Sequence, residues 1–177
     1  GQGSLALARR GGTGPPIALE HSGAKPSWVI SGPGEFSCIM PDALARRYGA
    51  SGINWIGKWI RYQYPGLPDW GGVATQVRWT PGQFELVAQS FHVLMRKRRV
   101  SLNVGFQRAT AGALARRAHS DVQTDSPTGI VEFQAAETGE PIDYEWRGGD
   151  LMSDVLAQLV TASGQEWTVD ADRIARW

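Results

Sequence analysis

The sequence lacks the residue groupings that usually build a chemical centre. Only one cysteine, Cys38, occurs in 177 residues, which excludes an internal disulfide and a zinc site made of thiolates. The three histidines, His21, His92 and His119, are far apart, and no two have the spacing of metal ligands. No phosphate-binding loop ending in Gly-Lys-Ser or Gly-Lys-Thr occurs, and no Gly-x-Ser-x-Gly elbow. We therefore expect no cofactor, no metal and no catalytic residues, and a protein that is not an enzyme.

A charge excess and a membrane-spanning segment are also missing. The 18 Lys and Arg nearly cancel the 17 Asp and Glu, so a net charge of +1 provides no global attraction to nucleic acid or anionic membranes. No apolar stretch approaches the roughly 20 residues needed to cross a bilayer, and the amino end lacks a secretion-signal pattern. We expect a soluble protein, with Cys38 as a buried thiol inside the apolar run from Phe36 to Met40.

Two titratable pairs are the remaining candidates for acid and base chemistry. His119 precedes Asp121 and could be oriented as a base only if a nucleophile came from elsewhere, whereas His92 has apolar neighbours and is expected to be a packing residue. Asp150 and Asp154 are one helical turn apart. Both lie in the first turn of an expected helix, where negative charge is stabilised, so capping explains them better than catalysis.

The richest pattern lies between Gly57 and Arg99. Residues 58–64 and 73–79 alternate with a period of two and are separated by Pro-Gly-Leu-Pro-Asp-Trp-Gly-Gly, as expected for half-buried strands joined by a turn. A second turn leads into residues 84–88, and from Ser90 the apolar spacing becomes helical through Phe91, Leu94 and Met95. The pattern predicts an antiparallel meander closed by a helix, with Trp79 as a large buried residue.

The rest of the chain alternates short strands with helices. Residues 1–27 are rich in glycine and proline, which predicts a flexible arm that is ordered only against a partner. Turn and cap residues then predict the following elements: a hairpin of 28–30 with 36–40, a helix over 43–48, a strand over 100–106, a helix over 107–119, a hairpin of 129–135 with 141–146, a helix begun by Asp150 and ended by Gly164, and strands over 167–169 and 174–177.

These elements predict a mainly β protein of the α+β class, with barrel-like antiparallel meanders and three to four short α-helices. We expect three parts: the arm at residues 1–27, a β-barrel-like domain with its closing helix at 28–106, and a second α+β segment at 107–177.

Two features leave the function open. The basic run from Arg96 to Arg99 closes a helix, where it complements the helix dipole and stays solvated, and its flanking Val100 and Leu102 do not offer the aromatic or glycine-rich context of a phosphate site. The eight tryptophans suggest a second interpretation. Trp55, Trp59 and Trp70 on one face would form a stacking platform for carbohydrate.

Three stretches resemble the hub proteins of phage tails and related contractile machines, the baseplate hub family. They are Trp70-Gly71-Gly72-Val73 between two strands, the strand and helix from Phe84 to Arg96, and the carboxyl part from Trp146-Arg-Gly-Gly-Asp-Leu151 through a helix to Trp167. In such hubs the Trp-Gly-Gly segment is a turn. The resemblance covers most of residues 28–177, but such hubs are usually longer, so the chain is a portion of a hub or a smaller relative.

This resemblance implies a structural role in the virion, at the tail tip or baseplate. Subunits would assemble as a homo-oligomer, a trimer in this family, joining the tail tube to the tip or spike around a channel through which DNA passes without sequence-specific contact. The residues it points to for architecture and assembly are Trp59, Trp70, Gly71, Gly72, Trp79, Phe91, Leu94, Arg96, Trp146 and Trp167. The alternatives are a carbohydrate-binding β module of a tail tip, or a tail-associated peptidase or muralytic domain in which His119 converges with Asp121 or Asp125.

Overall fold

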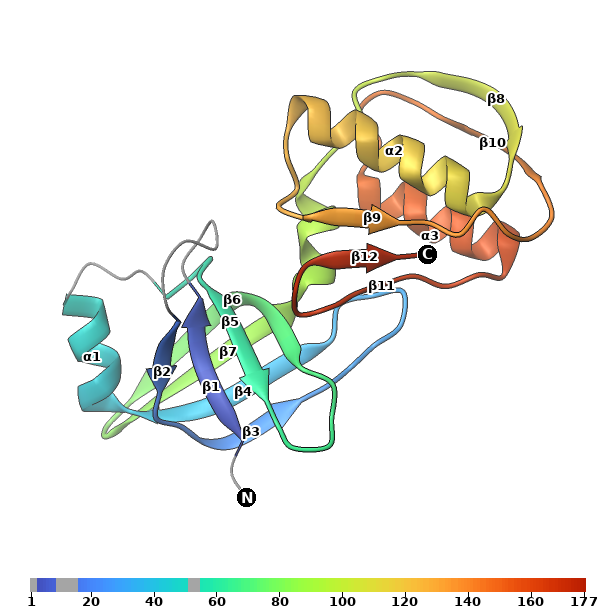
Figure 1. Ribbon diagram of the computed structural model, residues 1–177. Helices are drawn as coiled ribbons and strands as arrows, with labels where there is room; N and C mark the ends of the chain where they lie inside the picture. Colours follow the sequence, from blue (N-terminus) through green and yellow to red (C-terminus); the bar gives the residue numbers. More distant parts are fainter. Residues whose placement is uncertain (1–2, 9–15, 51–54) are drawn as a thin grey trace. The chain divides into compact units, whose positions relative to one another are not determined.

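The computed structural model describes residues 3–8, 16–50 and 55–177 (Figure 1). These residues form two compact units. Unit 1 comprises the described residues of Gly1–Val29 together with Pro33–Phe91, and unit 2 comprises Ile30–Gly32 together with His92–Trp177. The boundary expected near residue 106 therefore lies at 91/92, inside the short 3-10 helix η1 (Phe91–Lys97), and all of that helix after Phe91 belongs to unit 2.

Unit 1 is one antiparallel sheet with a helix. Its order is β2-β1-β5-β6-β7-β4-β3, and all its pairings are antiparallel. The elements are β1 (Ser4–Ala8), β2 (Ile17–Leu19), β3 (Ser22–Pro26), β4 (Glu35–Pro41), α1 (Asp42–Ala50), β5 (Trp59–Gln63), β6 (Trp70–Thr80) and β7 (Gln83–Ser90).

The sheet of unit 1 is curled like a barrel although hydrogen bonds do not close it among the described residues. Its two end strands, β2 and β3, are consecutive in the chain and separated only by Glu20 and His21. Consecutive Cα atoms are about 3.8 Å apart, so the Cα atoms of Leu19 and Ser22, three steps apart in the chain, lie within about 11 Å of each other. The first and last strands of a seven-stranded sheet can lie so close only if the sheet bends back on itself, as Figure 1 shows.

The alternating side chains of this sheet build the core of unit 1. Phe36, Cys38 and Met40 of β4 alternate with more exposed neighbours, as do Phe84, Leu86 and Ala88 of β7, and each of these side chains is almost fully buried. The Trp70 indole lies among them at 2% exposure. Its ring centroid is 5.2 Å from that of Phe36, and its Nε1 donates a hydrogen bond to the carbonyl of Ser27 at 3.0 Å.

Unit 2 has two small sheets and two α-helices, in addition to most of η1. Strand β8 (Val104–Ala109) pairs antiparallel with β10 (Ile142–Trp146). Strand β12 (Ile174–Arg176) pairs antiparallel with β11 (Thr168–Val169) and parallel with β9 (Glu132–Gln134). Helix α2 (Ala111–Asp125) begins at Thr110, whose hydroxyl accepts from the amide of Ala113, and α3 (Met152–Ser163) ends at Gly164, which has a φ of 68°.

The architecture confirms the predicted fold class, a mainly antiparallel α+β protein with short helices. The meander, its closing helix, the helix ended by Gly164 and the final antiparallel strand pair are all present. Helix α2 starts four residues later than expected and runs six residues further, because Thr110 caps it.

The amino segment corrects the expectation of an arm. The described part of residues 1–27 contains β1, β2 and β3, and β1 lies inside the sheet between β2 and β5. Leu5, Leu7 and Leu19 are buried at 2–4% exposure. The segment lacks a core of its own, but it gains one by pairing with strands elsewhere in the chain. Residues 9–15 lie outside the described part.

Two expected hairpins are also wrong. Strand β4 pairs with β3 rather than with residues 28–30, which are exposed and not in a strand. Strands β9 and β10 belong to different sheets, because β9 pairs with β12 and β10 pairs with β8. In both cases the true partner is not the segment that the intervening turn residues suggested.

Trp70 and Trp79 both lie on β6 but differ in burial, which gives a matched test. Trp70→Ala should lower the free energy of unfolding by about 3 to 5 kcal/mol, because it leaves a large cavity in the core. Trp79→Ala should cost about 1 to 2 kcal/mol, since Trp79 is 46% exposed and loses mainly its contacts with one aromatic ring and one arginine. Urea denaturation of both variants measures the difference, and equal losses would contradict this assignment of the core.

Candidate functional site

The Trp70-Gly71-Gly72 motif is the start of strand β6 and not a turn. The turn lies before it, where the amide of Leu67 donates to the carbonyl of Tyr64. A Cβ on Gly72 would lie 2.2 Å from the backbone oxygen of Gln89 and 2.6 Å from the Trp70 ring. The glycine is required because the indole lies over it and the neighbouring strand approaches closely, so the motif serves sheet packing.

The side chains of Trp55, Trp59 and Trp70 do not form the platform that a carbohydrate module would need. Trp55 is 4% exposed and Trp70 2%, while Trp59 is half-buried and meets Phe91 edge to face, with ring centroids 5.7 Å apart. Trp79 corrects the expectation of a buried residue. Its ring centroid lies 4.4 Å from that of Phe84, and the guanidinium of Arg46 lies 5.3 Å from its centroid.

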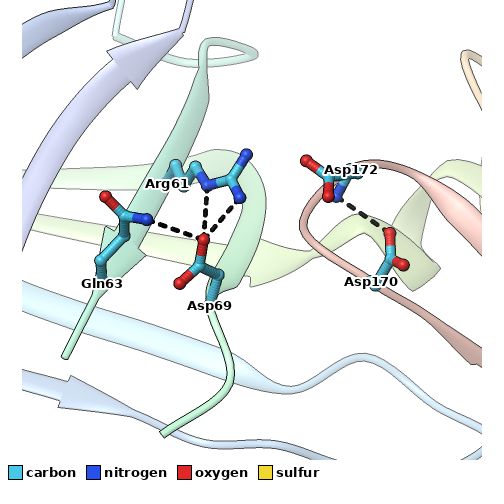
Figure 2. A network of polar contacts seen from close by, with 5 residues as sticks. All are labelled: Arg61, Gln63, Asp69, Asp170 and Asp172. Atoms are coloured by element: carbon cyan, nitrogen blue, oxygen red, sulfur yellow. Dashed lines mark hydrogen bonds and ion pairs between the residues drawn. The ribbon is translucent and has the colours of Figure 1, made fainter. Parts of the chain in front are cut away.

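A polar network lies on unit 1 where β5 meets the turn before β6. Figure 2 shows the side chains of Arg61 and Gln63 donating to one carboxylate oxygen of Asp69, at 3.0 Å from Arg61 Nε and 2.8 Å from Gln63 Nε2. The hydrogen bond from Arg61 holds the pKa of Asp69 below its usual value. The network fixes the loop to the strand and leaves no group poised to transfer a proton.

A second acidic group organises the β11–β12 turn of unit 2. Oδ1 of Asp170 accepts from the amides of Asp172 and Ile174, each at 2.9 Å, and Figure 2 shows the first of these bonds. Burial alone would raise the pKa of Asp170, but hydrogen bonds from the Ile174 amide and from the side chain of Arg176 more than offset it, so the pKa is lowered. Arg173 completes the turn at a φ of 63°.

The basic run divides into two halves. Arg96 and Lys97 are exposed at the end of η1, as expected of a solvated helix end. Arg98 instead donates to the carbonyls of Ser126 and Pro127, each at 3.1 Å, and Arg99 donates to the carbonyl of Gly149. The second half of the run therefore holds two loops of unit 2 in place.

His119 does not form the base of the peptidase or muralytic alternative. His119 is 6% exposed, its Nε2 is 3.3 Å from the Thr128 hydroxyl, and its ring stacks on Phe133. Asp121 instead accepts from the amides of Ser101 and Leu102. Since residues two apart on a helix face different sides, His119 and Asp121 do not converge.

His92 is confirmed as a hydrogen-bonded packing residue. It is 4% exposed, lies against Trp167 and accepts from the amide of Val169 at 3.1 Å. Burial lowers the pKa of both His92 and His119 to about 4, so both rings are neutral at pH 7.

The part of the chain that the structure describes contains no group of three or more His, Cys, Asp or Glu side chains that could hold a metal ion. Cys38 is buried as expected, and burial raises the pKa of its thiol to about 12, which makes it unreactive. Each described helix falls short of the length and apolar character that crossing a membrane requires.

The Trp146-to-Leu151 motif forms a turn that is tied to residues 98–103. The amide of Gly149 donates to the carbonyl of Val100 at 2.7 Å, and the amide of Gly148 donates to the side chain of Asn103 at 2.8 Å. A Cβ on Gly148 would lie 2.5 Å from the carbonyl oxygen of Ser101. Asp150 does not cap α3 as expected. It accepts from the Arg147 amide within the turn, and Leu151 occupies the cap position.

Beside this turn, unit 2 carries two hollows that share Val104 and Trp146 in their walls. The larger has a volume of about 550 Å³ and the smaller about 390 Å³. We call the two together the Trp146 groove. Its lining residues are Ser101, Leu102, Asn103, Val104, Gly105, Ala113, Arg116, Arg117, Ser120, Asp121, Thr124, Asp125, Glu145, Trp146 and Arg147.

The groove combines an apolar floor with one unmet hydrogen-bond donor. Trp146 is 2% exposed, and its buried Nε1 has no acceptor within hydrogen-bond distance in the described part of the chain. The ladder between β8 and β10 is also irregular at this point, with a register shift between Tyr144 and Trp146. Bulges of this kind are frequent next to binding sites. The lining contains no His or Cys.

The sequence indicated Trp146 but not the groove around it. Leu102, Val104 and Ala113 carry no distinctive pattern, and helix α2 approaches residues 101–104 only through tertiary contacts such as that of Asp121. The Gly-Gly pair after Trp146 was the only local signal, because it marks a close backbone approach.

Comparisons with solved structures show where this fold occurs. The chain is similar to a tail protein from Neisseria meningitidis MC58 (TM-score 0.62, 13% identity) over 99% of this chain and 50% of that one. It is similar to the prophage tail protein gp18 from Listeria monocytogenes EGD-e (TM-score 0.63, 10% identity) over 98% and 49%. It is also similar to the 43 kDa tail protein of prophage MuSo2 from Shewanella oneidensis (TM-score 0.60, 15% identity) over 98% and 53%.

This likeness shows a shared fold, and the chain spans about half the length of each of the three tail proteins. No family model matches the sequence, and no curated protein matches it.

Gly148 and Gly105 test the turn that holds the groove. Gly148→Ala should lower the free energy of unfolding by about 1 to 3 kcal/mol, because the new methyl group collides with the Ser101 carbonyl. Gly105→Ala should change it by less than about 0.5 kcal/mol, since no atom lies within 4 Å of a Cβ at this position. Chemical denaturation compares the stability of the two variants. If Gly148→Ala left the free energy of unfolding unchanged, Gly148 would not be packed tightly against the Ser101 carbonyl.

The buried histidines predict a loss of stability in mild acid. The pKa of each is about 4 in the folded protein and about 6.5 in the unfolded chain, so the unfolded state binds more protons between these values. The free energy of unfolding should therefore fall as the pH drops from 6.5 towards 4, by up to about 1.4 kcal/mol per pH unit for each histidine. His119→Asn removes one titration and should reduce this slope, measured by urea denaturation at several pH values. An unchanged slope would contradict the lowered pKa of His119.

Proposed function

We propose that this chain is a structural component of a phage tail or a related contractile particle. The observation that carries the proposal is the extent of the structural match. Each of the three matches covers 98–99% of this chain and therefore includes residues of both units. A match to one unit alone would be weaker support, because single sheets and helix pairs recur in unrelated proteins.

Within the tail, we assign the chain to an oligomeric hub that joins the tail tube to the tip or spike, in the tail tip or baseplate of the virion. The homo-oligomer, a trimer by resemblance, would surround a channel through which DNA passes without sequence-specific contact, and the role is structural rather than enzymatic. The near-zero net charge supports passage without tight binding, since a strongly basic surface would retain DNA.

The residues assigned to architecture and assembly divide by their burial. Trp79 and Arg96 are exposed and available to a neighbouring subunit, while Trp59 and Leu94 are half-buried. The others are buried and act through the fold that they hold: Trp70, Gly71, Gly72, Phe91, Trp146 and Trp167.

The solution mass of the chain tests the hub assignment. We expect a concentration-dependent assembly of three or more copies in sedimentation velocity, and ring-shaped particles in negative-stain images. The compact fold of each subunit should be unchanged by assembly, so far-UV circular dichroism serves as the control. A stable monomer at all concentrations that binds glycans would contradict the proposal.

A further inference from the structure

A separate hollow, of about 240 Å³, lies wholly within unit 1. It is lined by Gly3 directly before β1, by residues 21–24 at the start of β3, and by Tyr62 and Tyr64 on and just after β5. Strand β3 is one end of the curled sheet, while β1 and β5 lie near the other end. The hollow therefore lies at the seam that hydrogen bonds between described residues leave open, and we call it the seam hollow.

Strand β3 carries a bulge in the wall of this hollow. Gly23 and Ala24 both stand opposite the single residue Cys38 of β4. Gly23 has a φ of 59°, which glycine adopts without strain, and a Cβ at this position would have no atom within 4 Å. A bulge interrupts the ladder of hydrogen bonds and is over-represented next to binding sites. Here it leaves open space beside the lining residues.

The side chain of Tyr62 brings an unused hydroxyl to the hollow. The ring is buried, at 5% exposure, and packs on Phe36 with centroids 5.2 Å apart. The hydroxyl makes no hydrogen bond within the described part of the chain. In that part, Trp146 Nε1 is the one fully buried side-chain nitrogen or oxygen without a partner, so the Tyr62 oxygen keeps some contact with solvent. A Cβ on Gly3 would collide with this oxygen, which places the hydroxyl at the wall that Gly3 lines.

His21 adds a hydrogen-bond acceptor next to this hydroxyl group. Its Nδ1 lies 3.2 Å from the carbonyl oxygen of Leu19, and its ring meets Tyr62 edge to face with centroids 5.7 Å apart. Because a carbonyl only accepts, Nδ1 carries the proton in the neutral ring and Nε2 is left as an acceptor. Among the described residues, Nε2 has no hydrogen-bond partner of its own.

Tyr64 supplies an aromatic face at the edge of the hollow. It is 40% exposed and follows Tyr62 by two positions, so both side chains lie on the same side of the chain. The loop after Tyr64 is held to β5 by the network in Figure 2, in which Asp69 accepts from Arg61 and Gln63. A ring at the base of an anchored loop loses less conformational freedom when a ligand stacks on it.

These groups select a neutral, hydroxylated ligand. The lining contains no Asp, Glu, Lys or Arg, so an ionised ligand would lose hydration without gaining a countercharge. A purely apolar ligand would leave the Tyr62 hydroxyl and His21 Nε2 without partners. A sugar ring meets both conditions, because its hydroxyls donate and accept while its C–H face stacks on an aromatic ring. The volume is below the range of about 300 to 1,000 Å³ that is typical of drug-sized ligands, and it suits a single ring.

We propose that the seam hollow binds one neutral monosaccharide unit of a glycan. The Tyr62 hydroxyl and His21 Nε2 bond to hydroxyl groups of the sugar, and Tyr64 stacks on its ring. These residues are distinct from the three tryptophans in which the sequence suggested a stacking platform. The site lies within a single copy of the chain, so the inference does not depend on the proposed hub function and adds a ligand to it.

Saturation-transfer difference NMR on the full chain tests binding, with the methyl glycosides of glucose, galactose and mannose and with N-acetylglucosamine as probes. At least one should bind saturably, with a Kd on the order of a few millimolar for a ring of about 12 heavy atoms. Glucuronate is the charged comparison and should bind more weakly. The inference is overturned if no neutral sugar binds saturably up to about 50 mM, roughly tenfold above that Kd, or if glucuronate binds more tightly.

Two variants with matched controls locate the site. Tyr62→Phe keeps the ring and removes the hydroxyl, so it should weaken sugar binding at least about fivefold. Tyr144→Phe removes a hydroxyl of unit 2 that is bonded to Gln158, and should leave binding unchanged. Tyr64→Ala removes the stacking ring and should also weaken binding, whereas Leu67→Ala should not, since Leu67 is 48% exposed in the same loop but does not line the hollow. Equal binding by the wild type and both site variants would overturn the inference.

The unfolding of Tyr62→Phe separates a binding role from a structural one. Because the hydroxyl has no partner in the described part of the chain, its removal should leave the midpoint of thermal unfolding unchanged. A marked drop would show that the hydroxyl holds the fold and would overturn its assignment to a ligand. Sedimentation velocity on the same samples keeps the two proposals apart. Sugar binding by a chain that stays monomeric supports the seam hollow and contradicts the hub, whereas an assembled chain that binds no sugar does the reverse.

Discussion

One hydrogen bond crosses the inside of the sheet of unit 1 and can form only in a curled sheet. Trp70 lies on β6, the fourth strand in the order, and donates to Ser27, which directly follows β3 at the end of the sheet. In a flat sheet these strands would be about 14 Å apart. The bond therefore forms only if the sheet curls, and the absence of a side chain at Gly72 lets the indole lie flat over β6 while it does so. The buried rings of Phe36 and Tyr62 pack into the space that this curl encloses.

The elements that the sequence predicted correctly are those whose partners are close in the chain. The strands β5, β6 and β7 follow one another through short turns, and their alternating side chains predicted all three strands. The register shift between Ala74 and Gln76 was not predicted. Helix α3 combines an apolar stripe with a terminating glycine at Gly164. Two of the failures involve a distant partner. Strand β1 pairs with β5, more than 50 residues away, and β9 pairs in parallel with β12. Composition and turn chemistry carry no information about such pairings.

The candidate site, too, could be predicted from the sequence only in part. Trp146 and the glycines at 148 and 149 could be identified from the sequence only through the resemblance to hub proteins. The groove could not be identified, since it arises where helix α2 meets residues 101–104 through Asp121. That residue was taken as a partner for His119 from its place in the chain, but its carboxylate binds the amides of Ser101 and Leu102 instead. Neighbours in sequence on a helix are not neighbours in space.

The contact between Ser31 and Trp167 has a consequence for the order of folding. These residues are 136 positions apart, yet Ser31 lies in the loop between two strands of unit 1, β3 and β4. During synthesis, β3 and β4 emerge from the ribosome long before Trp167 exists. The loop that joins them lacks the Trp167 partner of Ser31 until more than 130 further residues have been made. Unit 2 is therefore completed by a piece of chain that is made before residues 33–91 of unit 1, and neither unit can be excised as one continuous stretch.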